Sequence, residues 1–329
     1  MSKYSMEVSK NNIEENQGGL LILMYGAKGW IGDMMRKILL DRGHTVIMGK
    51  ARLDNFEQLK EEISRIRPDR IFSSTGRTHG TYEGKVYGTI DYLELPGGLE
   101  KNIKDNLRGP VNLANICMDL EIHVTYMGTG CIFKYDDEHL MPMNTSVEKE
   151  DIDYHSLNGF TEDDHPNFFG SGYSTVKGQT DLLMHTYDNV LNCRIRMPIS
   201  ANNNKRNFIT KITTYEKICS IPNSMTVLPE ILPIMAHMLE TRETGTYNMT
   251  NPGLITHNKI LDLYQNKVDN NFKYQNFSLE EQAKILLSGR SNNYLVTHKL
   301  EKYCSDNDLV LDNIVVAVGK TLNNWTFLD

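Results

Sequence analysis

The N-terminal part of the chain alternates short apolar runs with amphipathic segments. The run 20–25 (LLILMY) is apolar throughout and stops at a glycine, which is typical of a strand buried on both faces of a parallel sheet. Large apolar side chains then recur at three- and four-residue spacing from 30 to 39, which predicts a helix. A second strand is expected at 45–48, so the three segments form one βαβ unit.

The same alternation continues to about residue 200. Strands that alternate with helices predict an α/β fold, a Rossmann-like, doubly wound parallel sheet. Residues 76–80, between two of these elements, are expected to form a glycine-rich loop. The predicted helices span about 56–67, 102–120 and 174–187, and the predicted strands span 70–74, 123–127 and 192–197.

Beyond residue 200 the alternation loosens, which predicts a smaller second domain. A helix is expected near 229–240 and a strand at 246–250, followed by short helices. We predict a flexible N-terminal tail at 1–19, a Rossmann domain at 20–200 with a return segment at 225–250, and mainly a cap domain at 201–329.

Composition narrows the class of protein. With 329 residues, 40% hydrophobic and 23% charged, the chain matches a globular protein large enough for a cofactor domain and a cap. Its net charge of −7 gives no global basic field for nucleic acid or an anionic membrane. No apolar stretch approaches a membrane span. The five scattered cysteines and ten histidines lack metal-ligand spacing, so we expect a cytoplasmic protein without a catalytic metal.

A glycine-rich segment follows the first strand. The spacing GxxGxxG between a strand and a helix places backbone N–H groups where they can hold a pyrophosphate, and it resembles the extended short-chain dehydrogenase/reductase superfamily. The alternative is a tight turn without a ligand. The predicted cofactor contacts here are Gly26, Lys28, Gly29, Trp30, Ile31 and Gly32.

The end of the second strand predicts which cofactor is used. An NAD enzyme would place an acid here for the ribose 2′-hydroxyl, whereas this chain has Lys50 and Arg52. Two cations suit a 2′-phosphate, so NADPH is favoured over NADH unless both are merely solvated charges. Asp54 is expected at the adenine amino group, and Gly76 and Arg77 at the cofactor diphosphate or ribose.

Tyr173 and Lys177 form a candidate catalytic pair. Their i, i+4 spacing puts a phenol and an ammonium on one helix face, and a nearby cation should lower the tyrosine pKa from about 10. Thr129 stands where the superfamily places a hydroxyl that bonds the substrate oxygen. The plainer alternative is an exposed Tyr–Lys helix pair.

From about residue 20 to 325 the chain resembles a more specific family, the bifunctional nucleotide-rhamnose synthases. These epimerase/reductases make UDP-L-rhamnose, or its dTDP counterpart, from the 4-keto-6-deoxyglucose nucleotide. One departure is the stretch 136–165, which is longer and more acidic than usual. The matching motifs are 29–32, 129–133, 173–177, 194–199, 206–211, 222–228, 251–253, 280–284 and 290–293.

The resemblance implies a division of roles. Cys131 and Lys211 would carry the 3,5-epimerisation, and Tyr173 would then protonate the substrate during reduction of C4 while Lys177 holds Tyr173 and the nicotinamide ribose. Without the resemblance, Cys131 reads as a small buried residue and Lys211 as a phosphate ligand. The other predicted substrate contacts are Thr129, Arg206, Asn207 and Arg290.

The leading hypothesis is therefore an NADPH-dependent UDP-4-keto-6-deoxy-D-glucose 3,5-epimerase/4-reductase that forms UDP-L-rhamnose. The alternatives are a pure dTDP/UDP-4-dehydrorhamnose reductase and a non-catalytic NADP-binding regulatory subunit. The resemblance also implies a homodimer formed through the Tyr–Lys helix and its neighbour. A separate 4,6-dehydratase is the expected upstream partner.

Overall fold

The computed structural model describes residues 18–142 and 154–328. The predicted N-terminal tail therefore lies almost wholly outside the described residues, as does part of the acidic stretch 136–165. Among the residues described, no helix has the length and apolarity needed to cross a membrane.

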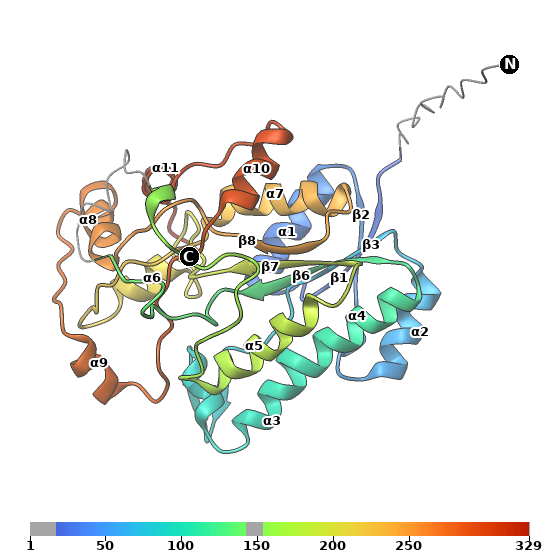
Figure 1. Ribbon diagram of the computed structural model, residues 1–329, viewed down its shortest axis with the longest axis horizontal. Coiled ribbons are helices and arrows are strands. Elements are labelled where there is room, and N and C mark those ends of the chain that lie inside the picture. Colours follow the sequence, from blue (N-terminus) through green and yellow to red (C-terminus); the bar gives the residue numbers. More distant parts are fainter. Residues whose placement is uncertain (1–17, 143–153, 329) are drawn as a thin grey trace, which may run out of the picture.

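A six-stranded parallel sheet forms the centre of the molecule (Figure 1). The strand order is β2-β1-β3-β6-β7-β8, so the direction of winding reverses between β1 and β3. In open α/β sheets ligands bind at the carboxyl ends of the strands beside such a reversal. The predicted doubly wound fold is confirmed. The strands are β1 (Leu21–Tyr25), β2 (Thr45–Met48), β3 (Arg70–Ser73), β6 (His123–Thr129), β7 (Val190–Ile195) and β8 (Gly245–Asn248).

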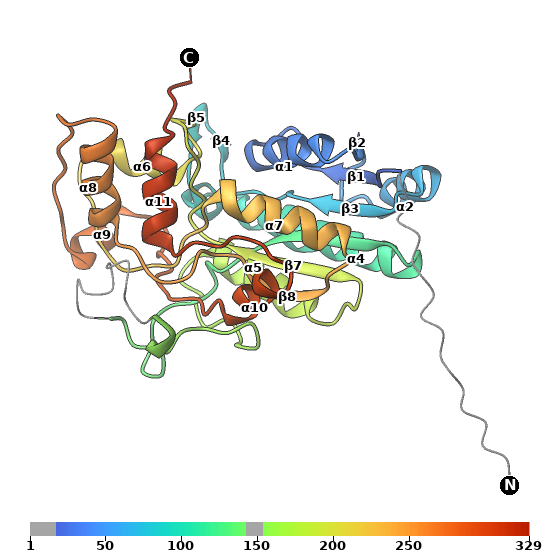
Figure 2. The ribbon, with the colours of Figure 1, turned by 90° about the horizontal axis from the view of Figure 1, so that it is seen from above.

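Helices cover both faces of the sheet, and the alternating side chains of β1 show why. Ile22 and Met24 enter a core shared with α1, α7 and α10, whereas Leu23 and Tyr25 enter a core shared with α2 and α4. Figure 2 shows this layering from above. These helices and their neighbours are α1 (Trp30–Asp41), α2 (Phe56–Ile66), α3 (Gly98–Ile103), α4 (Gly109–Asp119), α5 (Gly172–Met184), α7 (Leu228–Glu240) and α10 (His298–Asp306).

A separate apolar core lies beside the carboxyl ends of the strands. It combines Ile209 and Ile212 of α6 with Ile260 of α8 and Val318 of α11. Within the range 201–329, α7, β8 and α10 pack with the sheet instead. The domain boundaries at 200 and 201 stay a prediction. The remaining helices are α6 (Phe208–Thr213), α8 (His257–Lys267), α9 (Leu279–Ile285) and α11 (Ile314–Asn323), with 3₁₀ turns at Ile90–Glu94 and Tyr154–Ser156.

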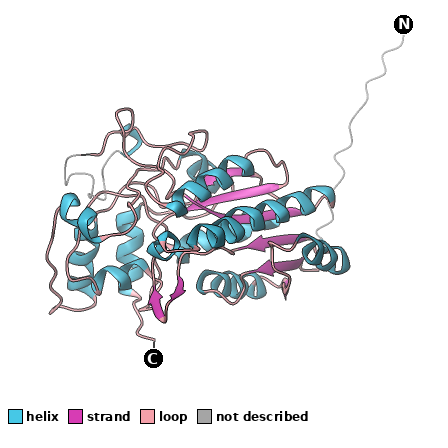
Figure 3. Cartoon of the chain, turned by 90° about the horizontal axis from the view of Figure 1, so that it is seen from below, coloured by secondary structure: helices cyan, strands magenta, loops and turns pink. Residues whose placement is uncertain are grey.

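Two local features differ from the sequence-based expectation. The expected glycine-rich loop 76–80 leads into a small antiparallel hairpin, β4 (Gly80–Tyr82) and β5 (Lys85–Tyr87), which stands apart from the main sheet (Figure 3). Glu83 and Gly84 at its tip both have positive φ, the geometry of a two-residue hairpin turn. The single helix expected at 102–120 is interrupted by a π-helical turn, Lys104–Arg108.

Candidate active site

The glycine-rich turn has the backbone geometry of a phosphate cradle. Gly26 has a φ of +82°, and a Cβ on Gly32 would lie 2.1 Å from the Gly26 carbonyl oxygen, so both positions require glycine. Gly29 is the N-cap of α1, whose first N–H groups therefore face the space in front of the turn. The residues present fit a dinucleotide pyrophosphate at this position.

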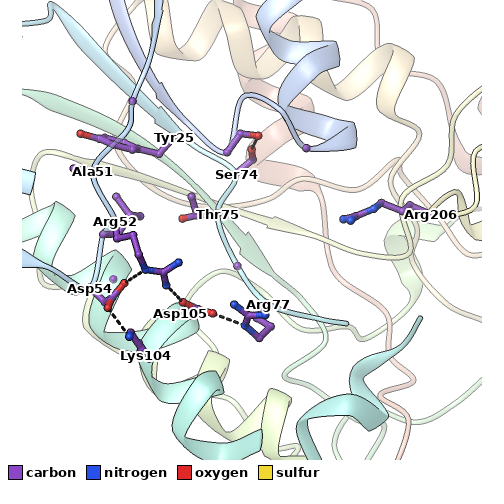
Figure 4. A pocket seen from close by; sticks show the side chains of 16 residues that line it. Tyr25, Ala51, Arg52, Asp54, Ser74, Thr75, Arg77, Lys104, Asp105 and Arg206 are labelled. Carbon is purple, nitrogen blue, oxygen red and sulfur yellow. Dashed lines mark hydrogen bonds and ion pairs between the residues drawn. The ribbon is translucent and has the colours of Figure 1, made fainter. Parts of the chain in front are cut away.

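A pocket of about 350 Å³ opens in front of this turn (Figure 4). Seven of the predicted cofactor contacts do not line it: Lys28, Trp30, Ile31, Gly32, Lys50, Tyr173 and Lys177. The predicted cofactor contacts that do line it are Gly26, Gly29, Arg52, Asp54, Gly76 and Arg77.

Ion pairs cross the floor of this pocket. Arg52 donates from Nε to Asp54 at 2.8 Å and from Nη2 to Asp105 at 2.7 Å. Asp54 also pairs with Lys104 at 3.1 Å, and Arg77 pairs with Asp105. Asp54, expected at the adenine amino group, is thus engaged by two cations.

Glu62 of α2 orders the backbone after β2. Its carboxylate accepts hydrogen bonds from the backbone N–H groups of Lys50 and Ala51, both at 3.0 Å, and from Tyr25 Oη at 2.9 Å. Burial raises the pKa of the Glu62 carboxyl, but the two backbone bonds, the Tyr25 hydroxyl and the charge of Arg65 together outweigh it, so the net pKa is lowered. We did not predict this residue. The sequence feature that could have indicated its role is an acidic residue on the buried helix face that Leu59 and Ile63 define.

The predicted catalytic residues meet at the end of β6. Thr129 is the last residue of that strand, and its hydroxyl lies close enough to Tyr173 of α5 to affect the pKa of the phenol. The backbone N–H of Cys131 donates to the same Thr129 oxygen at 3.1 Å. Ser171 caps α5 by accepting from the N–H of Ser174, which fixes the helix start at Gly172, one residue before Tyr173. A hydroxyl, a phenol and a thiol-bearing residue thus share one corner of the site.

The pKa of Tyr173 differs from the expectation. Burial raises it, the neighbouring Cys131 raises it further, and the Thr129 hydroxyl only partly opposes this. We predicted a lowered pKa from the nearby Lys177, and that was wrong. The Lys177 ammonium donates to Tyr126 Oη instead and lies 4.6 Å from the centre of the Tyr126 ring.

Lys177 itself is only 4% exposed, and burial lowers its pKa to about 8 although Asp181 and Cys131 oppose this. Its partner Tyr126 lies on β6 and is 2% exposed. Tyr126 was not predicted. The signal was its strand position, because the alternation along β6 directs residue 126 into the core that contains α4.

Two buried arginines hold this corner in place. Arg194 of β7 is fully buried and binds Asp181 of α5 through both carboxylate oxygens, at 2.9 and 2.6 Å, which ties the helix to the sheet. Arg196 donates to the carbonyl oxygen of Gly130 at 3.2 Å and to Asn223 at 2.7 Å, which supports the turn before Cys131.

The other predicted substrate contacts lie on the cap side. Burial lowers the pKa of Lys211, and the charges of Arg206 and Arg290 lower it further, so the three cations share one region. Arg206 lines the cofactor pocket and donates to His79 Nε2 at 2.7 Å, and Arg290 pairs with Asp91 at 3.0 Å.

Two placements bear on the predicted roles. Within 18–142 and 154–328, no hydrogen bond or ion pair joins Cys131 to Lys211. Asn207 is fully buried as the N-cap of α6, and its amide bonds the backbone of Ser200 and Ile209, which leaves its predicted substrate contact without structural support.

A phosphate-binding turn at the sheet reversal, beside a Thr–Tyr–Lys set at the end of β6 and on α5, defines a dinucleotide-dependent reductase of the extended short-chain dehydrogenase/reductase class. No family model matches the chain. It is 49% identical to the uncharacterized protein L780 of Acanthamoeba polyphaga mimivirus, over 91% of this chain and 97% of that protein. The crystal structure of L780, described as a UDP-rhamnose synthase, covers 93% of this chain and 100% of that one with a TM-score of 0.83 and 47% identity.

Plant relatives extend the comparison. The chain is 40% identical to a bifunctional dTDP-4-dehydrorhamnose 3,5-epimerase/dTDP-4-dehydrorhamnose reductase of Arabidopsis thaliana, over 85% of this chain and 86% of that protein. A trifunctional 4,6-dehydratase/3,5-epimerase/reductase of the same plant is 39% identical over 91% of this chain, which spans only 42% of it. The chain belongs to the family of nucleotide-rhamnose epimerase/reductases, which confirms the resemblance found in the sequence.

Proposed function

We propose that this chain is an NADPH-dependent UDP-4-keto-6-deoxy-D-glucose 3,5-epimerase/4-reductase that forms UDP-L-rhamnose. The observation that carries the proposal is the corner at the end of β6, where Thr129 joins Tyr173 and Cys131. A pure reductase needs the first two residues but has no use for the third. The name of the bifunctional plant relative, a 3,5-epimerase/reductase, supports both activities in one chain.

Epimerisation follows from the substrate ketone. The C4 carbonyl acidifies the protons on C3 and C5, because the carbanion left by proton removal delocalises into an enolate. With the C4 oxygen against Thr129 and Tyr173, a ring carbon faces Cys131, whose sulfur removes or returns a proton. Lys211 is the proposed partner that serves the opposite face of the ring.

The position of Lys211 also favours a second role. It lies with Arg206 and Arg290, a set of cations suited to the diphosphate of the sugar nucleotide. If Lys211 only binds phosphate, Lys211→Met should raise KM for the sugar nucleotide and leave deuterium exchange at saturation unchanged. Loss of exchange with unchanged KM would assign Lys211 to proton transfer.

Reduction completes the reaction. NADPH, when bound, supplies the hydride to C4. Tyr173 donates its phenolic proton to the C4 oxygen as the carbonyl becomes an alcohol, and Thr129 holds that oxygen by a hydrogen bond. The raised pKa of Tyr173 keeps the phenol protonated before the hydride arrives, so the residue serves as an acid. Lys177, buried one helical turn along α5 from Tyr173, is the proposed contact of the nicotinamide ribose.

The test is incubation of the purified protein with UDP-4-keto-6-deoxyglucose in deuterated buffer, with and without NADPH. We expect deuterium at C3 and C5 without NADPH, and UDP-L-rhamnose when NADPH is added, read by NMR and mass spectrometry. Reduction of pre-epimerised substrate with no exchange would identify a pure reductase instead. If the protein shows no deuterium exchange and consumes no NADPH, the remaining hypothesis is a protein that binds the cofactor without catalysis.

We also propose that the enzyme acts as a cytoplasmic homodimer and receives its substrate from a separate 4,6-dehydratase. Support for the dimer comes from apolar side chains exposed along α4 and α5: Met118 (48% exposed), Leu120 (37%) and Leu183 (41%). A mass near twice that of one chain in size-exclusion chromatography with light scattering is expected. A Leu183→Glu variant that still gives the dimer mass would place the interface elsewhere.

A further inference from the structure

The π-helical turn between α3 and α4 delivers two charged residues to the cofactor pocket. The turn spans Lys104–Arg108, and its first two residues, Lys104 and Asp105, both line the pocket. Inserted π-helical turns are uncommon and concentrate at functional sites, because they redirect side chains that a regular helix would place elsewhere. Neither residue has a role in the proposed chemistry.

These two residues complete a chain of alternating charges, shown in Figure 4. Asp105 pairs with both Arg77 and Arg52, Arg52 pairs with Asp54, and Asp54 pairs with Lys104. The carboxylates are the less exposed members, at 11% for Asp54 and 15% for Asp105, whereas the Arg52 side chain is 58% exposed. Three cations and two anions thus surround the position expected for the adenosine half of the cofactor.

Asp105 is not needed to hold the Arg52 guanidinium or to fix the backbone of Arg77. The Arg52 guanidinium is also held by Asp54, through its Nε at 2.8 Å. The backbone of Arg77 is held on both sides by Asn106, whose Oδ1 accepts from the Arg77 N–H at 2.8 Å and whose Nδ2 donates to the Arg77 carbonyl oxygen at 2.9 Å. Asp105 thus places a negative charge between two cations, binding the Arg77 guanidinium and sharing that of Arg52 with Asp54.

That charge acts selectively on the cofactor. A ribose 2′-phosphate bound by Arg52 brings further negative charge close to the Asp105 carboxylate, and like charges at short range repel. A ribose with a free 2′-hydroxyl brings no such charge. The carboxylate also competes with the phosphate for the guanidinium donors of Arg52.

We propose that Asp105 is a specificity-determining residue of the cofactor site, which limits the preference for a dinucleotide carrying a 2′-phosphate by engaging Arg52 and Arg77. The inference rests on the proposed function only in that a dinucleotide occupies this pocket. The enzyme should accordingly use NADPH with a moderate rather than an absolute preference over NADH.

The test measures binding of two half-cofactor probes by isothermal titration calorimetry, without any sugar. For Asp105→Asn we expect 2′,5′-ADP to bind about three- to tenfold more tightly than to the unchanged protein. The affinity for 5′-AMP should change less than about twofold, because it carries no phosphate at this position. Asp105→Glu, which keeps the charge, should retain most of the original ratio of the two affinities, that for 2′,5′-ADP over that for 5′-AMP.

Asp306→Asn is the matched control, because Asp306 also forms an ion pair, with Lys302 on α10, but lies outside the pocket. If Asp105→Asn unfolds, Asp105→Ser carries the same comparison. Equal changes for both probes, or weaker binding of 2′,5′-ADP, would overturn the proposal. The proposal would also be overturned if neither probe binds to the unchanged protein. Because no sugar is present, failure of the epimerase/reductase assignment leaves this result standing.

Discussion

The pocket in front of the glycine-rich turn and the corner at the end of β6 differ in charge and in burial. The proposed cofactor site contains partly exposed ion pairs around Arg52, whereas the proposed reaction site contains Thr129, Tyr126 and Lys177, each less than a tenth exposed. Exposed ion pairs contribute little individually, so they can be changed one at a time to adjust ligand preference. Burial, in contrast, lowers the Lys177 pKa to about 8, so each hydroxyl that bonds the ammonium affects its charge state. Changes in the proposed reaction site should therefore have the larger effects.

Tyr173→Phe should give the largest effect. Without the phenol there is no proton for the C4 oxygen, so we expect kcat for NADPH oxidation to fall about 10³-fold, within the usual range for a lost general acid. Deuterium exchange without NADPH should persist. Tyr187→Phe, which removes a phenol bonded to Asn115 at the protein surface, is the control. Substantial reductase turnover in Tyr173→Phe would remove this residue from the proton-donor role.

Asp181→Asn should show how much the proposed reaction site depends on its buried ion pair. Asp181 is 3% exposed and Arg194 fully buried, so loss of the carboxylate charge leaves a buried cation without its counter-ion. We expect the free energy of unfolding to drop by about 3 kcal/mol, measured by chemical denaturation. Asp306→Asn, at an exposed pair on α10, should change it by less than about 1 kcal/mol. Similar losses in both variants would contradict the contrast between the two regions.

Cys131→Ala separates the two activities. We expect the rate of deuterium incorporation at C3 or C5 to fall about 10²-fold, because the thiol no longer accepts the proton. Reduction of pre-epimerised substrate should continue. Cys304→Ala on α10, in the core above the sheet, is the matched cysteine control. Normal exchange in Cys131→Ala would show that another group performs the proton transfer.

Tyr126→Phe should give a smaller change, visible as a shift with pH. The reaction needs the Lys177 ammonium, so kcat/KM should fall as pH rises through about 8. The Tyr126 hydroxyl accepts a hydrogen bond from that ammonium and favours its charged form. Its removal should lower the Lys177 pKa and move the alkaline limb down by about one unit. A limb that stays in place, with only a uniform loss of rate, would indicate a purely structural role for Tyr126.

The sequence predicted most of the sheet because burial on two faces leaves a continuous apolar run. The strand at 45–48 agrees with β2, and β1 begins one residue later than predicted. The hairpin β4–β5 was missed because strands of three residues carry too little periodicity to detect. The π-helical turn was missed because 102–120 has a helical pattern on both sides of it.

Site residues could be predicted where their spacing lies within one strand or helix. Contacts between residues of different elements could not be predicted from the sequence. The turn from Gly26 to Gly32, the Tyr173–Lys177 spacing and the position of Thr129 follow from one strand or helix each. Glu62, Asp105 and Tyr126 could not be assigned, because their partners lie 11, 53 and 51 residues away along the chain. The prediction of a lowered Tyr173 pKa was wrong for the same reason, because that pKa depends on which acceptor the Lys177 ammonium contacts.

The sequence alone thus determined the fold class and the family, and it located the glycine-rich turn and the Thr–Tyr–Lys set whose roles are proposed. Each depends on side-chain type and local periodicity, which the chain carries in order. The tertiary structure decided which charges neutralise one another in the cofactor pocket, and that Lys177 contacts Tyr126. Ion pairing and desolvation depend on distances between elements and on exclusion of water, and both arise only when the helices close over the sheet.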